Sequence, residues 1–167
     1  MAILEILQYP DARLNTPAQR VEKIDATTRK LIDDMVDTMY AAPGVGLAAT
    51  QVDAHKEIIV IDVSDDRTDL RVFVNPEIIR REGVAMNQEG CLSIPGIYDN
   101  VERAESVTVT ALDRNGSRFT LNASGMLAAC IQHEMDHLRG QVFIDYLSEL
   151  KQNRVRAKLK KRQRKAA

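Results

Sequence analysis

The sequence predicts an α+β fold in which antiparallel or mixed β-sheets surround one central helix, with a further helix at the C-terminal end. Three observations lead to this prediction. Short segments rich in β-branched residues fill the middle of the chain, an apolar run of helical character follows at 125–138, and a basic segment of helical character ends the chain. The length of 167 residues fits one domain with a sizeable core.

The first third of the chain is predicted to hold one long helix. Residues 3–8 are expected to form a strand or an extended lead-in, and residues 10–14 a turn or a single helical turn. Asp25 is a suitable N-cap for a helix that ends near Ala42, where a Pro-Gly pair stops it. The apolar residues at helical spacing are Leu31, Ile32, Met35, Val36 and Met39.

Strands and the central helix follow. The predicted strands are residues 57–63, 71–75, 77–81, 106–112 and 119–121. Pro95-Gly96 is expected to turn the chain, and Asn115-Gly116 is typical of a hairpin turn. The central helix is expected over 125–138 with Gly140 as its C-terminal glycine, and the last helix over 148–165.

The composition limits the cellular setting. The first residues lack a basic region followed by a long apolar core, so no signal peptide is expected. No apolar run approaches the ~20 residues that a membrane span needs. We therefore expect a cytoplasmic protein that does not enter a membrane. In such a protein Cys91 and Cys130 are expected to be metal-binding or free rather than joined in a disulfide.

The charge is distributed unevenly. Residues 151–167 contain nine of the 23 basic residues and no acidic residue, so the other 14 basic residues share the rest of the chain with all 24 acidic ones. This division indicates an acidic body with a basic tail. We expect residues 1–147 to form a single catalytic α+β domain, with residues 148–167 appended as a basic helix or tail.

The predicted central helix carries the pattern H-E-x-x-H at residues 133–137. Residues four apart lie on one helix face, so His133 and His137 would present two imidazoles to one metal ion. Glu134 could then reach a metal-bound water without being a ligand. Two histidines on an ordinary polar helix face are the alternative. The apolar flanks disfavour it, because buried imidazole and carboxylate groups need partners.

A catalytic zinc or iron site needs a third protein ligand and one open position. The remaining histidine, His55, lies in a polar stretch and is expected to be exposed and idle. After His137 the only acidic residues are Asp145 and Glu149, both close by. That proximity argues against an ordinary zinc endopeptidase, in which the third ligand lies well downstream of the helix.

The cysteines are the remaining donors. Cys130 lies on the same helix face as the histidines, but seven residues, or ~10 Å, separate it from His137. Metal–ligand bonds are only ~2.0–2.3 Å long, so Cys130 is interpreted as a small buried packing residue. Cys91 lies in another segment, which is free to approach. One thiolate, two imidazoles and a water would complete the coordination.

Three segments resemble the motifs of the peptide deformylase family. Residues 44–51, GVGLAATQ, match G-x-G-x-A-A-x-Q, and residues 89–93 match E-G-C-L-S. Residues 132–137, QHEMDH, match Q-H-E-x-D-H. The similarity extends over nearly the whole chain, and three motifs in the correct order are highly specific.

The resemblance implies a hydrolase that removes the N-formyl group from the formyl-methionine of newly made polypeptides and releases formate. It implies that Cys91, His133 and His137 bind one divalent metal, typically Fe(II), for which Zn, Ni or Co can substitute. A metal-bound water would be the nucleophile.

The resemblance also implies roles around the metal. Glu134 would be the general acid/base, while Gln51 and the backbone amide of Leu92 would stabilise the oxyanion. The residues expected to hold the peptide backbone or the methionine side chain are Val45, Gly46, Gly90, Met126, Ala129 and Cys130. Core packing is an equal interpretation for the apolar members of this set.

The basic helix at 148–165 allows two interpretations. It could be a solvated, frayed terminal helix, or it could dock on ribosomal RNA by neutralising phosphates. The resemblance supports docking, because some deformylases use their C-terminal helix in this way. We therefore expect nascent polypeptides and the ribosome as partners of a monomeric enzyme.

Two other functions compete with a deformylase. A peptidase uses similar chemistry, but the missing downstream ligand speaks against it. A ribosome-binding protein with an inactive, structural metal site is the second. The presence of the ligand residues together with Glu134 and Gln51 argues against such a loss of activity.

Overall fold

The computed structural model describes residues 2–166, with side-chain burial described as far as Arg162. Met1, Ala167 and the side chains of Arg164 and Lys165, all part of the predicted domain or tail, lie outside the described part. The helices are α1 (Ala26–Ala41), α2 (Gly125–Leu138) and α3 (Glu149–Ala166). The strands are β1 (Gly46–Ala48), β2 (Ile58–Ile61), β3 (Arg71–Glu82), β4 (Ala85–Cys91), β5 (Ile94–Arg103), β6 (Ser106–Leu112) and β7 (Arg118–Ser124). Three 3-10 turns are η1 (Ala12–Asn15), η2 (Ala49–Val52) and η3 (Phe143–Tyr146).

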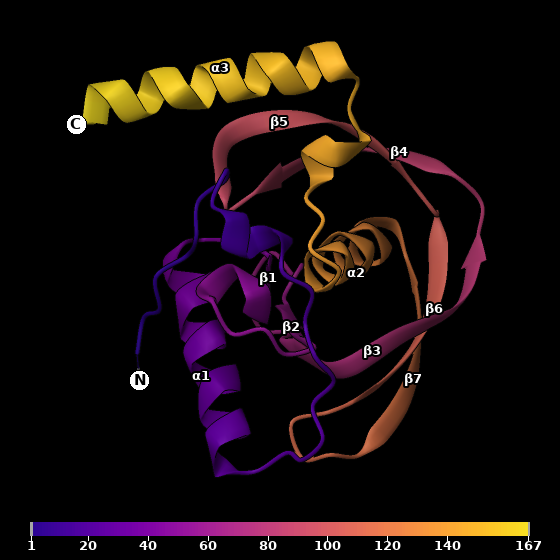
Figure 1. Ribbon diagram of the computed structural model, residues 1–167. Coiled ribbons are helices and arrows are strands. Elements are labelled where there is room, and N and C mark those ends of the chain that lie inside the picture. Colours follow the sequence, from indigo (N-terminus) through magenta and orange to yellow (C-terminus); the bar gives the residue numbers. More distant parts are fainter. Residues whose placement is uncertain (1, 167) are drawn as a thin grey trace.

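The strands form two antiparallel units around α2, which confirms the predicted fold class (Figure 1). Five strands make one sheet in the order β1-β2-β3-β6-β7, and β4 and β5 form a separate hairpin. Helix α2 packs its apolar side, including Ala128, Ile131 and Met135, against the five-stranded sheet. The central helix is therefore held by tertiary packing, which is where most helical stability in proteins originates.

The first helix confirms its predicted boundaries. The Asp25 side chain accepts a hydrogen bond from the Thr28 amide at 3.0 Å and so caps α1. Ile32, Met35 and Met39 are fully buried in a second apolar cluster, with residues of β1 and β2. The N-terminal segment is extended, as expected, and the Leu7 amide donates to the Gln51 carbonyl at 2.7 Å.

Several strand predictions were wrong in detail. Residues 71–82 form one strand, β3, instead of two. Its pairing with β6 shifts register between Val74 and Glu77, and Pro76 lies within this irregular stretch. Proline cannot donate a ladder hydrogen bond, and the strand tolerates it at this irregularity. The chain turns at Leu92 and Ser93 instead of at Pro95-Gly96, which lies within β5.

Three strands were not predicted at all. β1 has only three residues and exists because it pairs with β2, Gly46 opposite Ile61. The β4–β5 hairpin is largely polar, and Figure 1 shows it on the far side of α2 from β2 and β3. A third apolar cluster, built from β5, η3 and α3, packs this hairpin against the C-terminal part of the chain.

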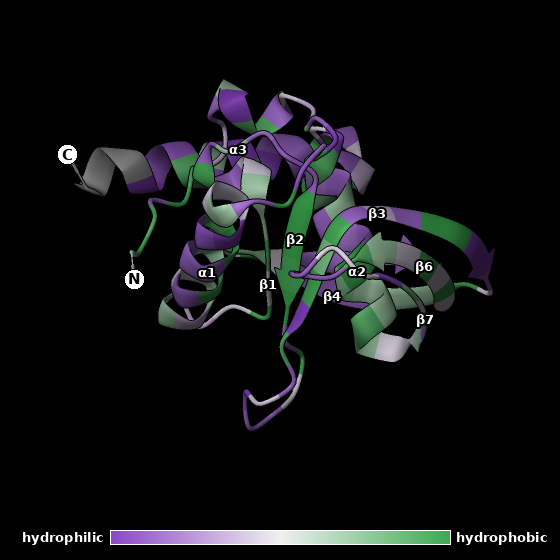
Figure 2. Ribbon diagram, turned by 90° about the horizontal axis from the view of Figure 1, so that it is seen from below, coloured by the Kyte–Doolittle hydropathy of each residue, from purple (hydrophilic) through white to green (hydrophobic). Residues whose placement is uncertain are grey.

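The last helix lies across the outside of the hairpin (Figure 1). Val155 and Leu159 are its buried contacts, and they join Ile97 and Val101 of β5. The rest of α3 is mainly hydrophilic, whereas β2 is hydrophobic throughout (Figure 2). Within residues 2–166 no helix is both long and apolar enough to cross a bilayer.

Candidate metal centre and active site

Three donor side chains from two elements meet beside α2. Cys91 ends β4, and His133 and His137 lie one turn apart on α2. Their ligand atoms all lie within 4.8 Å of one another, and Cys91 Sγ is 3.4 Å from His137 Nε2. This group, the set anticipated from the sequence, is the one arrangement of its kind found among residues 2–166.

The surroundings of the donors fit a resident divalent cation. His133 Nδ1 is 2.8 Å from Glu89 Oε1, an arrangement that fixes the ring and leaves Nε2 for a metal. Although burial opposes it, hydrogen bonds from Arg103 and His133 hold the pKa of Glu89 below its ordinary value. Within residues 2–166, His137 Nδ1 is buried and unpaired, so packing and the contact of Nε2 with Cys91 Sγ orient that ring.

The second cysteine does not belong to this group. Burial raises the pKa of the Cys130 thiol to about 12. A metal ligand must be a thiolate, so this environment disfavours Cys130 as a ligand. His55 is not part of the ligand group either. It is half-buried instead of exposed as predicted, with Nε2 3.1 Å from the Arg13 carbonyl oxygen.

A buried ionic network supports the donors from behind. Arg103 donates to Glu89 through Nε and Nη2, both at 2.8 Å, and to Asp136 through Nη1 at 2.5 Å. The Tyr146 hydroxyl donates to the same Asp136 oxygen at 2.7 Å, and the Arg103 guanidinium lies over the Tyr146 ring. The network therefore joins β4, β5, α2 and η3 around His133.

Sequence reasoning missed this network. Glu89 and Asp136 belong to the motifs, but no role follows from their spacing, and nothing in the sequence singles out Arg103 or Tyr146. The available signal was indirect: charged residues within motifs beside an apolar helix need partners when they are buried. Finding those partners required the fold.

Replacing Arg103 by methionine should strongly destabilise the protein. The Arg103 side chain is only 4% exposed, and its loss leaves Glu89 and Asp136 as buried, uncompensated carboxylates. Breaking such a buried pair costs about 3–5 kcal/mol of the free energy of unfolding. Urea unfolding followed by circular dichroism measures the change, and metal titration should show affinity reduced by about 10–100-fold.

Arg114→Met is the matched control. Arg114 also forms a two-point ion pair, with Asp33, but the pair lies on the surface. Its removal should barely move the unfolding midpoint, because water solvates both partners. Equal effects of the two substitutions would contradict a supporting role for the buried network.

Glu134 is buried next to the donors and faces the cavity. A Cβ atom at Gly46 would lie 2.6 Å from Glu134 Oε2, so only glycine lets β1 pass this closely. Within residues 2–166, Glu134 Oε1 is buried and accepts no hydrogen bond. Burial raises the pKa of Glu134 to about 7, and an adjacent divalent cation would lower that value. The unpaired Oε1 is therefore placed to exchange a proton with a group in the cavity.

Gln51 is held on the other side of Cys91. The Ala48 amide donates to Gln51 Oε1 at 2.9 Å, and this contact leaves the amide nitrogen to point towards Cys91 and Ser93. Gln51 Nε2 is 3.6 Å from Cys91 Sγ and 3.0 Å from Ser93 Oγ. Leu92 follows Cys91 directly in the turn between β4 and β5, so its backbone amide is also near the donors.

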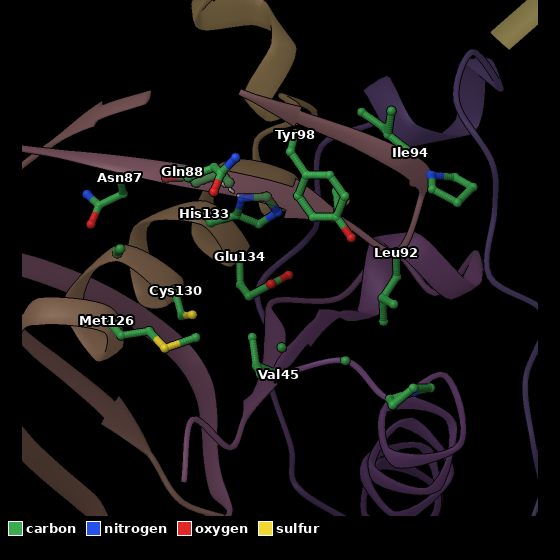
Figure 3. A pocket seen from close by; sticks show the side chains of 18 of the residues that line it. Val45, Asn87, Gln88, Leu92, Ile94, Tyr98, Met126, Cys130, His133 and Glu134 are labelled. Carbon is green, nitrogen blue, oxygen red and sulfur yellow. Dashed lines mark hydrogen bonds and ion pairs between the residues drawn. The ribbon is translucent and has the colours of Figure 1, made fainter. Parts of the chain in front are cut away.

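These groups share one cavity of about 620 Å³. Cys91, Glu134, Gln51 and Leu92 line it, as does His133, while His137 lies beneath. All the residues anticipated for substrate binding also line it: Val45, Gly46, Gly90, Met126, Ala129 and Cys130. Figure 3 shows Glu134 between Met126 and Cys130 on one side and Tyr98 on the other.

The site defines a metal-dependent hydrolase. It combines the sulfur of Cys91 on β4 with the two imidazoles of the H-E-x-x-H helix, beside a buried carboxylate and an open cavity. The family model of polypeptide deformylase matches residues 3–153. A peptide deformylase of Neisseria meningitidis is 57% identical over 164 residues, which cover 98% of each chain.

Solved structures agree with this match. A crystal structure of a peptide deformylase from Legionella pneumophila has a TM-score of 0.94 at 50% identity, covering 98% of this chain and 96% of that one. A peptide deformylase from Ehrlichia chaffeensis in complex with actinonin has a TM-score of 0.94 at 42% identity, covering 98% and 99%. The chain belongs to the polypeptide deformylase family. It is a hydrolase that removes the N-formyl group from nascent polypeptides in a metal-dependent reaction.

Proposed function

We propose that Cys91, His133 and His137 hold one Fe(II) ion and that Glu134 is the general acid/base of deformylation. The convergence of the three donors beside a buried carboxylate is the observation that carries this proposal. A mixed thiolate and imidazole set also accepts Zn, Ni or Co. Metal analysis of anaerobically purified protein tests the iron assignment, and one zinc per chain with no iron would contradict it.

A cation at this site supplies Lewis-acid chemistry, which polarises the formyl carbonyl and lowers the pKa of a water towards neutrality. Glu134 Oε1, which has no hydrogen-bond partner within residues 2–166, would accept a proton from the attacking water. The same carboxyl group then returns the proton to the leaving amine nitrogen. Burial raises the pKa of Glu134, which favours uptake of the proton, whereas a nearby cation would lower it and favour the return of the proton.

The developing oxyanion needs fixed donors. Gln51 Nε2 is oriented by the Ala48 amide, and the Leu92 amide is fixed by the ligand residue before it. Each such preorganised donor typically contributes ~10²–10³ in rate. The hydrogen bond from Gln51 Nε2 to Ser93 Oγ would have to lengthen or break for Nε2 to donate to the substrate.

The cavity accounts for the choice of substrate. Val45, Met126, Ala129 and Cys130 supply apolar surface beside Glu134 and would receive the methionine side chain. Gly46 and Gly90 would allow the peptide backbone to approach closely. A formyl carbon bears only hydrogen, so a tight site admits it and excludes larger acyl groups.

Formate release tests this function directly. The metal-loaded protein should release formate from formyl-Met-Ala-Ser and no acetate from acetyl-Met-Ala-Ser. It should also leave the peptide bonds of Met-Ala-Ser intact. Peptide-bond cleavage without formate would favour a peptidase, and no product at all would favour a structural metal site.

We also propose that α3 docks on ribosomal RNA. Val155 and Leu159 face the hairpin, whereas Arg154, Lys158, Lys160 and Lys161 are exposed. A helix fixed on one side and basic on the other is suited to phosphate binding. Because the cavity is complete within one chain, we further propose a monomer that acts in the cytoplasm, where nascent chains emerge.

Charge reversal tests the docking without removing the buried side of α3. Arg154, Lys158 and Lys161 are exposed, and changing all three to glutamate should abolish salt-sensitive co-sedimentation with ribosomes. Reversing Arg20, Lys23 and Arg118, which are exposed on the body, is the control with equal charge change. Each phosphate contact contributes roughly 0.7–0.9 to the logarithmic salt slope. Equal binding by both triple variants would refute docking through α3.

A further inference from the structure

One aromatic side chain at the cavity has no assigned role. Tyr98 lies on β5, where side chains alternate between two faces. Its neighbour Ile97 is buried beneath α3, and so is Val101. Tyr98 points the other way, lines the cavity and remains 66% exposed. An exposed aromatic ring at a cavity mouth offers contact surface to a ligand.

The opposite strand fixes where this ring lies. A Cβ atom at Gly90 would be 2.5 Å from Cε1 and 2.7 Å from Cδ1 of Tyr98. The ring therefore lies against the bare backbone of β4, one residue from Cys91. A larger residue at position 90 would push the ring away, so glycine and tyrosine form a matched pair across the hairpin.

The two sides of the cavity differ. Figure 3 shows Met126 and Cys130 on one side of Glu134 and Tyr98 on the other. In an extended peptide, successive side chains point in opposite directions. When the methionine side chain points towards Met126 and Cys130, that of the next residue points away from them, towards the side on which Tyr98 stands.

We propose that Tyr98 is a specificity-determining residue that recognises the second residue of the substrate, with a preference for aromatic and large apolar side chains. This proposal rests on the deformylase function proposed above. The ring supplies an apolar face beside the backbone of Gly90, against which a second aromatic ring can stack or pack edge-on. Glycine at the second position makes no such contact.

The test is the ratio of kcat/KM values for two substrates. For formyl-Met-Phe-Ser and formyl-Met-Gly-Ser, the wild-type kcat/KM should be higher for the phenylalanine peptide. Tyr98→Ala should lower the phenylalanine-to-glycine ratio roughly 3- to 10-fold, as expected for losing one aromatic contact. Tyr98→Phe keeps the ring and should retain the ratio. The ratio cancels any general change in metal content or folding.

Met86→Ala is the matched control, because Met86 is an exposed apolar residue of the same hairpin that does not line the cavity. Its ratio should equal that of the wild type. Equal proportional losses on both peptides in Tyr98→Ala would overturn the proposal and leave a merely structural role. Wild-type protein that releases no formate from either peptide would instead overturn the deformylase function itself.

Discussion

Replacing Glu134 by glutamine should lower kcat for formate release by roughly 10²–10⁴-fold while the metal remains bound. Glutamine keeps the shape of the carboxylate but cannot accept the proton. Glu134 Oε1 is buried, has no partner within residues 2–166 and faces the cavity, so it is free to accept a proton there. Steady-state kinetics with formyl-Met-Ala-Ser, together with metal content per chain, measures both halves of this expectation.

The reason for a large effect is geometric. Glu134 is 5% exposed and is confined between α2 and the backbone of Gly46, so solvent buffers cannot replace it easily. Glu134→Asp is a useful second variant, because it keeps the negative charge but shortens the side chain by one methylene. Activity within threefold of the wild type in Glu134→Gln, at full metal content, would exclude Glu134 as the acid/base.

Replacing Cys91 by alanine should lower the metal affinity by more than about 100-fold, because losing a residue that only hydrogen-bonds to a ligand already costs about 10–100-fold. Cys91 supplies the sole sulfur of the donor group, with Sγ 3.4 Å from His137 Nε2. Anaerobic titration with Co(II), followed through its thiolate charge-transfer absorption, reports both affinity and the presence of the sulfur ligand.

Cys130→Ser is the matched control for that measurement. Cys130 also lines the cavity, but its thiol stays protonated because burial raises its pKa to about 12. The control should retain one metal per chain and the thiolate absorption band. A reversal, in which Cys130→Ser loses the metal and Cys91→Ala keeps it, would show that the ligand assignment is wrong.

Much of this architecture was predictable because local patterns agree with the tertiary structure. Asp25 caps α1 where the sequence places it, and α2 has the predicted boundaries. The convergence of Cys91 with the two histidines also followed from the sequence, since one straight helix cannot supply three donors to one ion.

The remaining features depend on tertiary contacts. β4, with the sequence AMNQEGC, has little β-branched character and forms because β5 pairs with it. The link from Glu89 to Arg103 and on to Tyr146 joins residues far apart in the chain. Neither contact produces a regular spacing of residues in the sequence, so neither could be predicted from sequence patterns.

The third apolar cluster has a consequence for biosynthesis. Cys91 and Tyr9 pack against this cluster, whose members include Val155 and Leu159 of α3. During translation the ligand sulfur is made long before the residues that cover its hairpin. The candidate metal site therefore acquires its outer wall only after α3 has been made.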